Sequence, residues 1–130
     1  MGTEVRARAK HVPIPARKVR RVIDQVRGLY ADDALEILHF LPHAAAHPVA
    51  KLIHSAVANA EENFGIPRDE LLVAHITADD GPGVMPGKGW RRRFGGRGRS
   101  RPIRKRSSHI TLILEESEEE IDDLRLGDLK

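Results

Sequence analysis

The chain has 130 residues, of which 40% are hydrophobic and only 4% aromatic, so it has the length of one domain with a modest core. It contains no cysteine, which excludes disulfides, cysteine-ligated zinc and a thiol nucleophile. No apolar run approaches the roughly 20 residues of a membrane span, and the N-terminus lacks the apolar stretch of a signal peptide, so we expect a soluble intracellular protein.

The formal net charge of +3 is distributed very unevenly along the chain. Residues 1–27 carry a net charge of +6 and residues 81–106 carry +10, whereas residues 28–80 carry −7 and residues 107–130 carry −6. Two cationic blocks separated by acidic ones are typical of a protein with a polyanionic partner.

The first part of the chain predicts one strand followed by three helices. Residues 3–12 alternate apolar and basic side chains, which predicts a half-buried strand with a cationic outer face. Residues 15–27 repeat apolar side chains every three to four positions, which predicts an amphipathic helix. Further helices are expected over residues 31–40 and roughly 43–63. Because of Pro48, either the regular part of the third helix starts near His47 or its first turns are kinked.

The second part predicts two strands joined by a long cationic connection. Residues 71–78 and 108–114 are strand-like, and the connection between them favours an extended hairpin over about 79–110. At about 3.3 Å per residue, each leg would reach on the order of 45 Å. An arm of this composition is expected to be disordered alone and ordered by a partner. Residues 115–130 are expected to form an acidic, mobile tail.

The basic connection carries the strongest chemical signal. Arginine presents a planar fork that binds phosphate oxygens in pairs, and Trp90 and Phe94 flank an arginine run where they are able to stack on bases. A solvated charge run is the alternative, but ten like charges without counter-charges favour nucleic-acid contact. The segment lacks the apolar face of a membrane-surface helix. Its candidate residues are Lys88, Trp90, Arg91, Arg92, Arg93, Arg97, Arg99, Arg101, Arg104, Lys105 and Arg106.

The N-terminal block is the second candidate RNA-binding surface. Its basic residues lie on a predicted strand and a predicted helix, and we expect them to form one patch rather than an ordinary charged helix face. They are Arg6, Arg8, Lys10, Arg17, Lys18, Arg20 and Arg21.

Three further patterns share single features with metal sites or enzyme sites. His39, His43 and His47 recur every four residues, but prolines interrupt the helix and no carboxylate lies among them, so we expect surface or partner-facing histidines and no metal or cofactor. The glycine-rich stretch lacks the spacing and the Ser or Thr of a nucleotide-binding loop. Adjacent serine and histidine residues diverge on a helix or strand, so we expect no enzyme.

Several short stretches follow one another in a specific order. They are ARAK at 7–10, RKVR at 17–20 with Arg27 and Gly28, ALEIL at 34–38, SAVANAE at 55–61, Gly81 with Pro82, and RKRSSHI at 104–110. In this order, with a long basic connection before the last, the chain from about Glu4 to Leu114 resembles the universal large-subunit ribosomal protein twenty-two family, in its bacterial or organellar form.

The resemblance implies an α+β fold: three helices packed on a small antiparallel three-stranded sheet, with a long protruding β-hairpin. It implies one RNA-binding domain over 1–114, in a structural protein that binds large-subunit ribosomal RNA of the 23S type, aids assembly and lines the nascent-peptide exit tunnel. The resemblance also adds His109 to the candidate RNA-binding residues. The implied tunnel tip, within roughly 84–97, consists of Met85, Lys88, Trp90, Arg91, Arg92 and Arg93.

The implied partners are large-subunit ribosomal RNA, neighbouring large-subunit ribosomal proteins and the nascent polypeptide. We expect no membrane contact, no obligate homo-oligomer, and a location in cytoplasmic or organellar ribosomes. One alternative is a non-ribosomal RNA- or DNA-binding regulator that uses the basic segment as a disordered arm. An RNA-processing enzyme is a third hypothesis, for which the sequence assembles no site.

Overall fold

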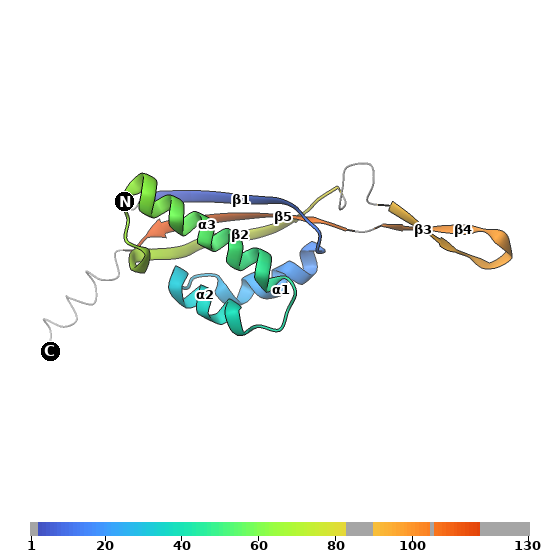
Figure 1. Cartoon of the computed structure of the whole chain (residues 1–130), viewed down its shortest axis with the longest axis horizontal. Coiled ribbons are helices and arrows are strands. Elements are labelled where there is room, and N and C mark those ends of the chain that lie inside the picture. The colour runs from blue at the N-terminus through green and yellow to red at the C-terminus, as the bar shows by residue number, and fades with distance from the viewer. Residues whose placement is uncertain (1–2, 83–89, 105, 118–130) are drawn as a thin grey trace, which may run out of the picture.

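A computed structural model describes residues 3–82, 90–104 and 106–117 of the chain. Three helices lie against a sheet of long strands, and a second, two-stranded sheet lies beyond one end of it (Figure 1). The predicted α+β class, with three helices on a three-stranded antiparallel sheet, is confirmed. The elements are β1 (Glu4–Val12), α1 (Ala16–Val26), α2 (Ala31–Phe40), α3 (Ala46–Phe64), β2 (Leu71–Asp80), β3 (Trp90–Phe94), β4 (Ser100–Arg104) and β5 (Ser108–Glu116).

The last strand, β5, forms the centre of the three-stranded sheet. The strand order is β1-β5-β2, and both neighbours run antiparallel to β5. Because side chains alternate along a strand, Ile110, Leu112 and Leu114 are fully buried, while the residues between them are partly exposed. The strand continues to Glu116, two residues beyond its predicted end at Leu114, because the Glu116 amide donates to the carbonyl of Thr3 at 3.2 Å.

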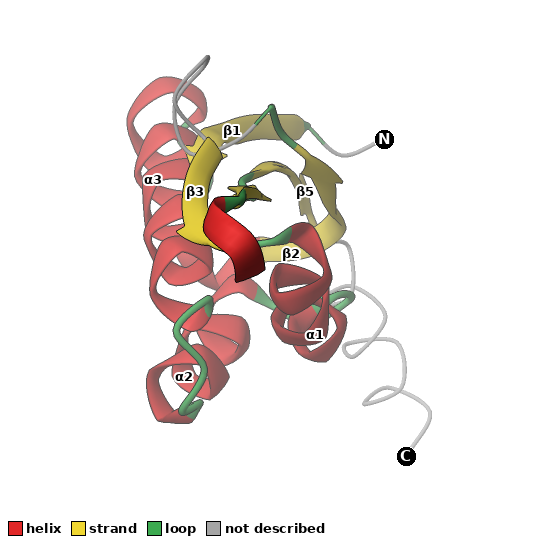
Figure 2. Ribbon diagram, turned by 90° about the vertical axis from the view of Figure 1, so that its right-hand side faces the viewer, coloured by secondary structure: helices red, strands yellow, loops and turns green. Residues whose placement is uncertain are grey.

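The helices supply the other half of the core. α1 packs on β2, α3 packs on β1, and α2 packs on α3 (Figure 2). In α1 the predicted apolar face is buried, consisting of Val19, Val22, Ile23 and Val26. Helix α3 begins at Ala46, which agrees with the predicted alternative of a regular helix starting near His47. Pro48 is therefore in the first turn, where the backbone N–H has no partner within the helix, and it does not kink the helix.

The first strand contains a bulge that its alternating sequence does not predict. The pairing of β1 with β5 shifts register between Ala9 and Val12, and His11 adopts a φ of 57°. Before the bulge the prediction holds, because Val5 is buried and the basic residues of the strand are exposed. The bulge lies where the end of β1 meets the start of β5, since Val12 pairs with Ser108.

Strands β3 and β4 pair antiparallel in a separate two-stranded sheet, from Trp90 opposite Arg104 to Phe94 opposite Ser100. They lie between β2 and β5 in sequence and beyond the end of the main sheet in space (Figure 1). Residues 83–89 and 105 lie outside the described residues, so a continuous hairpin over 79–110 stays a prediction. The acidic tail also lies outside them from residue 118 onward. Within the described residues, no helix is long and apolar enough to cross a membrane.

Candidate nucleic-acid interface

A basic groove of about 440 Å³ lies between β1 and the first half of α3. Its cationic side chains are Arg8 and Lys10 from the strand and Lys51 from the helix. Imidazoles and a hydroxyl add further hydrogen-bonding groups, and among the described residues no carboxylate lines the groove. The described lining residues are Arg8, Ala9, Lys10, His11, Val12, Pro13, His47, Pro48, Lys51, Leu52 and Ser55.

The composition of this groove, called the β1–α3 groove below, fits a phosphate backbone. Arg8, Lys10 and Lys51 are exposed, so their charges are accessible to a ligand. A cleft that carries one sign of charge between apolar walls concentrates the electric field and attracts the opposite charge. Phosphate contacts of this kind position a protein on nucleic acid without reading its base sequence.

The structure adds three residues that the sequence prediction missed. His47, Lys51 and Ser55 recur every four positions in α3, so they lie along one side of the helix and face Arg8 and Lys10. This polar stripe beside the apolar one was visible in the sequence. What the sequence did not reveal is that α3 packs against β1.

The bulge in β1 ties the groove to the base of the β2–β5 connection. The backbone amide of His11 donates to Nδ1 of His109 at 3.1 Å, and the two rings meet edge to face with centroids 5.0 Å apart. A left-handed conformation at a non-glycine residue costs about 1–3 kcal/mol and persists where surrounding contacts hold it. His11 therefore joins the groove to the start of β5, next to the candidate residue His109.

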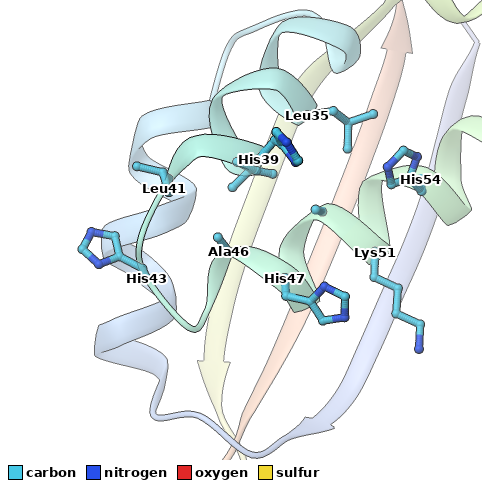
Figure 3. Close-up of a pocket in the computed structure, with 10 residues that line it drawn as sticks. Leu35, His39, Leu41, His43, Ala46, His47, Lys51 and His54 are labelled. Atoms are coloured by element: carbon cyan, nitrogen blue, oxygen red, sulfur yellow. The ribbon is translucent and has the colours of Figure 1, made fainter.

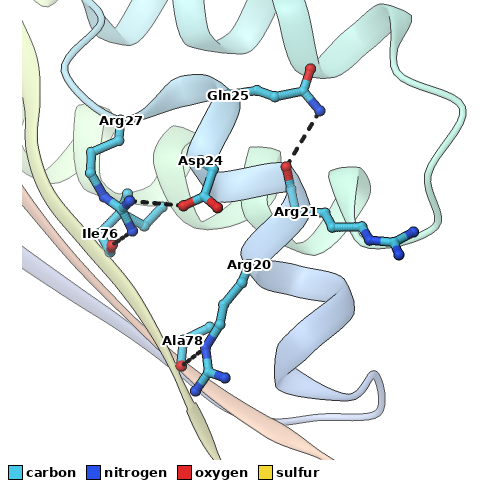
Figure 4. Close-up of polar contacts among 7 residues, drawn as sticks. All are labelled: Arg20, Arg21, Asp24, Gln25, Arg27, Ile76 and Ala78. Atoms are coloured by element: carbon cyan, nitrogen blue, oxygen red, sulfur yellow. Dashed lines mark hydrogen bonds and ion pairs between the residues drawn. The ribbon is translucent and has the colours of Figure 1, made fainter.

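Arg20 holds the other leg of the same connection (Figure 4). Its Nε donates to the carbonyl of Ala78 at 3.1 Å, and Nη2 of Arg27 donates to the carbonyl of Ile76 at 2.9 Å. These carbonyls belong to the edge strand β2, whose exposed backbone groups would otherwise be open to pairing. Arg20 was predicted as an RNA-binding residue. The structure gives it a positioning role, with further N–H donors left on the guanidinium.

The remaining basic residues of the N-terminal block are exposed. Arg6, Arg17, Lys18 and Arg21 have accessible side chains, and the 3.5 Å ion pair of Arg6 with Glu4 is exposed and therefore weak. The two halves of the block contact opposite edges of the sheet, β1 beside α3 and α1 beside β2. One continuous patch over both halves stays a prediction.

The second sheet carries predicted RNA-binding residues of the basic connection. In the register of β3 and β4, Trp90 stands opposite Arg104 and Arg93 stands opposite Arg101. Arg97, with a φ of 58°, and Arg99 lie in the turn and are exposed, as is Arg106. The predicted tip residues Met85 and Lys88, and the predicted RNA-binding residue Lys105, lie outside the described residues.

The histidines line a second hollow of about 540 Å³, between α2 and α3 (Figure 3). His43 lies on the connection between the helices, so the four-residue spacing does not place the three histidines on one helix face. In the part of the chain that the structure describes, no group of three or more histidine or acidic side chains gathers to hold a metal. The hollow shares His47 and Lys51 with the β1–α3 groove, so cationic and imidazole groups surround the start of α3.

Comparison with known proteins assigns the chain to a family. A family model described as ribosomal protein L22p/L17e matches residues 7–115. The chain belongs to this family. Large ribosomal subunit protein uL22 of Desulfitobacterium hafniense is 44% identical over 116 residues, which cover 89% of this chain and 97% of that protein. The protein of the same name from a Synechococcus species is 46% identical over 116 residues, covering 89% and 90% respectively.

Membership of the L22p/L17e family confirms the resemblance found in the sequence. Proteins of this family are structural, non-enzymatic parts of the large ribosomal subunit, in agreement with the expectation that the chain is no enzyme. The matched span contains the whole β1–α3 groove, both legs of the β2–β5 connection and His109. Arg6 and the acidic residues beyond 115 lie outside it.

Proposed function

We propose that this chain binds large-subunit ribosomal RNA of the 23S type and helps to assemble the subunit. The observation that supports this most is the β1–α3 groove, where Arg8, Lys10 and Lys51 converge from two elements without a carboxylate. In a large-subunit ribosomal protein, the partner that matches such a groove is the phosphate backbone of ribosomal RNA.

The proposed mechanism is phosphate neutralisation at closely packed RNA segments, not catalysis. Arg8 offers a planar fork for paired hydrogen bonds, and Lys51 offers a compact mobile charge. Because these groups meet phosphates rather than base edges, recognition rests on the shape of folded RNA. The contribution of each contact falls with salt concentration as counterions compete.

We further propose that the β2–β5 connection is an extended hairpin that lines the nascent-peptide exit tunnel, with residues near its tip beside the nascent polypeptide. His11 contacts the β5 leg through His109, and Arg20 contacts the β2 leg through the carbonyl of Ala78. These two contacts support a fixed direction in which the hairpin leaves the body. The net charge of +10 over residues 81–106 supports ordering of the hairpin by RNA. Neighbouring large-subunit proteins complete the proposed partners.

The domain boundaries belong to the same proposal. Residues 1–114 form one RNA-binding domain, and residues 115–130 carry a net negative charge, which disfavours contact with RNA. The ribosome concerned is cytoplasmic or organellar.

Sedimentation of the full chain from cells tests the proposal. We expect near-stoichiometric comigration with large subunits. A free RNA- or DNA-binding regulator would instead remain outside the subunit fractions, and this result would overturn the ribosomal function.

Deletion of residues 89–96 tests the tunnel role separately. We expect incorporation into subunits to remain largely intact, while nascent-chain stalling or macrolide sensitivity changes. If the deletion blocks incorporation, the hairpin is an assembly anchor rather than a tunnel element.

A further inference from the structure

The outward side of α2 exposes two large apolar side chains, Ile37 and Phe40, that are not part of the buried core. A shallow hollow of about 640 Å³ is lined by Leu29, Asp33, Glu36, Ile37, Phe40 and Leu41, called the α2 face below. Phe40 is 78% exposed and Ile37 is 37% exposed. Helix α2 packs into the core through other residues, Ala31, Ala34 and Leu38, so folding does not explain Phe40.

The charge of the α2 face is opposite to that of the β1–α3 groove. Asp33 and Glu36 line the hollow, no basic residue does, and neither carboxylate has an ion-pair partner within the described residues. The neighbouring Asp32 differs, since it accepts a 2.8 Å hydrogen bond from Nε of Arg68. Two unpaired carboxylates repel a phosphate backbone, which disfavours RNA on this side of α2.

The spacing of these residues gives the α2 face a defined geometry. Asp33, Ile37 and Phe40 follow one another at helical intervals of four and three, so they lie along one side of α2. This side faces away from the hollow between α2 and α3. In Figures 1 and 2, α2 lies across the molecule from β1, so the α2 face is separate from the groove.

We propose that the α2 face docks a protein segment that carries both cationic and apolar side chains. An apolar side chain would cover Phe40 and Ile37, while a lysine or arginine would reach Asp33 or Glu36. Arginine suits this surface especially well, because its guanidinium pairs with a carboxylate and stacks on an aromatic ring. The inference rests on the proposed function in one respect, that the segment belongs to a neighbouring large-subunit protein.

Site-specific photocrosslinking in cells tests the docking surface. The full chain carries p-benzoylphenylalanine in place of Phe40, or in a second variant in place of Ile37, and the crosslinked residues are identified by mass spectrometry. We expect both positions to capture the same protein segment, with lysine or arginine next to apolar residues. The same label in place of Phe64, which is 50% exposed at the end of α3, should not capture it.

Charge reversal tests the role of the carboxylates. The paired substitution Asp33→Lys and Glu36→Lys should lower the crosslink yield at least about tenfold, because truncating or reversing a central interface contact costs that much or more. The matched control, Glu61→Lys with Glu62→Lys, reverses two exposed acidic residues on α3 and should leave the yield unchanged.

Each other outcome overturns the docking proposal. The proposal is wrong if the labelled positions capture RNA or a second copy of this chain. It is also wrong if neither position gives a crosslink, or if charge reversal leaves the yield unchanged. Sedimentation of the same variants reports on the ribosomal function independently. If the chain comigrates with large subunits but captures RNA, the docking surface is wrong and the proposed function stands. If the chain captures the basic segment but does not comigrate with large subunits, the docking surface stands and the proposed function is wrong.

Discussion

The contact between Gly81, just after β2, and Ser107, just before β5, predicts the effect of adding one methyl group at Gly81. The amide of Gly81 donates to the carbonyl of Ser107 at 3.0 Å, which joins the two legs between β2 and β5. A Cβ atom at Gly81 would lie 2.5 Å from Oγ of Ser107 and 3.3 Å from Cε1 of His109. Ser107 is only 1% exposed, so its hydroxyl has no open space into which to move. Gly81→Ala therefore forces the legs or the serine apart.

Two opposing effects set the size of this change. Gly81 does not have a positive φ, so alanine is compatible with its backbone, and such a substitution ordinarily stabilises by about 0.4–1 kcal/mol through the unfolded chain. Overpacking a filled site costs about 1–3 kcal/mol. The 2.5 Å contact is shorter than real Cβ contacts, so the second effect dominates. We expect Gly81→Ala to lower the free energy of unfolding by about 1–2 kcal/mol.

A double-mutant cycle measured by chemical denaturation isolates the contact. Ser107→Ala removes the Oγ atom, so Gly81→Ala should cost close to nothing in that background. Gly96→Ala is the matched control, because nothing lies within 4 Å of its added Cβ, and it should change stability by less than about 0.5 kcal/mol. An equal cost of Gly81→Ala with and without the serine hydroxyl would refute the reasoning.

Three further substitutions have defined outcomes. Arg20→Leu should lower the free energy of unfolding by about 1 kcal/mol in denaturant melts, because the carbonyl of Ala78 loses its donor. Ile53→Ala should lower it by about 2–5 kcal/mol, since Ile53 is fully buried and leaves a cavity; a loss below about 1 kcal/mol would contradict the packing. Lys51→Gln should weaken binding to ribosomal RNA and reduce the salt slope by about one, whereas Glu62→Gln, at the far end of α3, should not.

The sequence predicted the helices and strands in which apolar and polar side chains alternate with a regular period. Alternation in β1 correctly placed Val5 inside and Arg6 outside, and the three-to-four repeat of α1 correctly placed Val19 inside. For α3 the sequence left two alternatives open, because Pro48 is compatible either with a kinked helix or with a position in the first turn. In the structure Pro48 lies in the first turn, where its missing N–H removes no hydrogen bond of the helix.

Features that depend on contacts between distant segments were not predictable. Nothing in the local sequence distinguishes His11 as a residue with positive φ, because the contact that accompanies it comes from His109, 98 residues away. Arg20 resembled its basic neighbours, and only the carbonyl of Ala78, 58 residues away, gives it a positioning role. Lys51 became a candidate RNA ligand only once α3 lay beside β1.

The most direct test of the central claim is the salt dependence of binding between the full chain and large-subunit ribosomal RNA. Several phosphate contacts should make affinity fall steeply with salt, with a slope that grows by roughly 0.7–0.9 for each phosphate neutralised. Removing Arg8 and Lys51 together, as Arg8→Gln with Lys51→Gln, should flatten that slope by about two. An affinity insensitive to salt, or a slope unchanged by the two substitutions, would contradict phosphate binding in the β1–α3 groove.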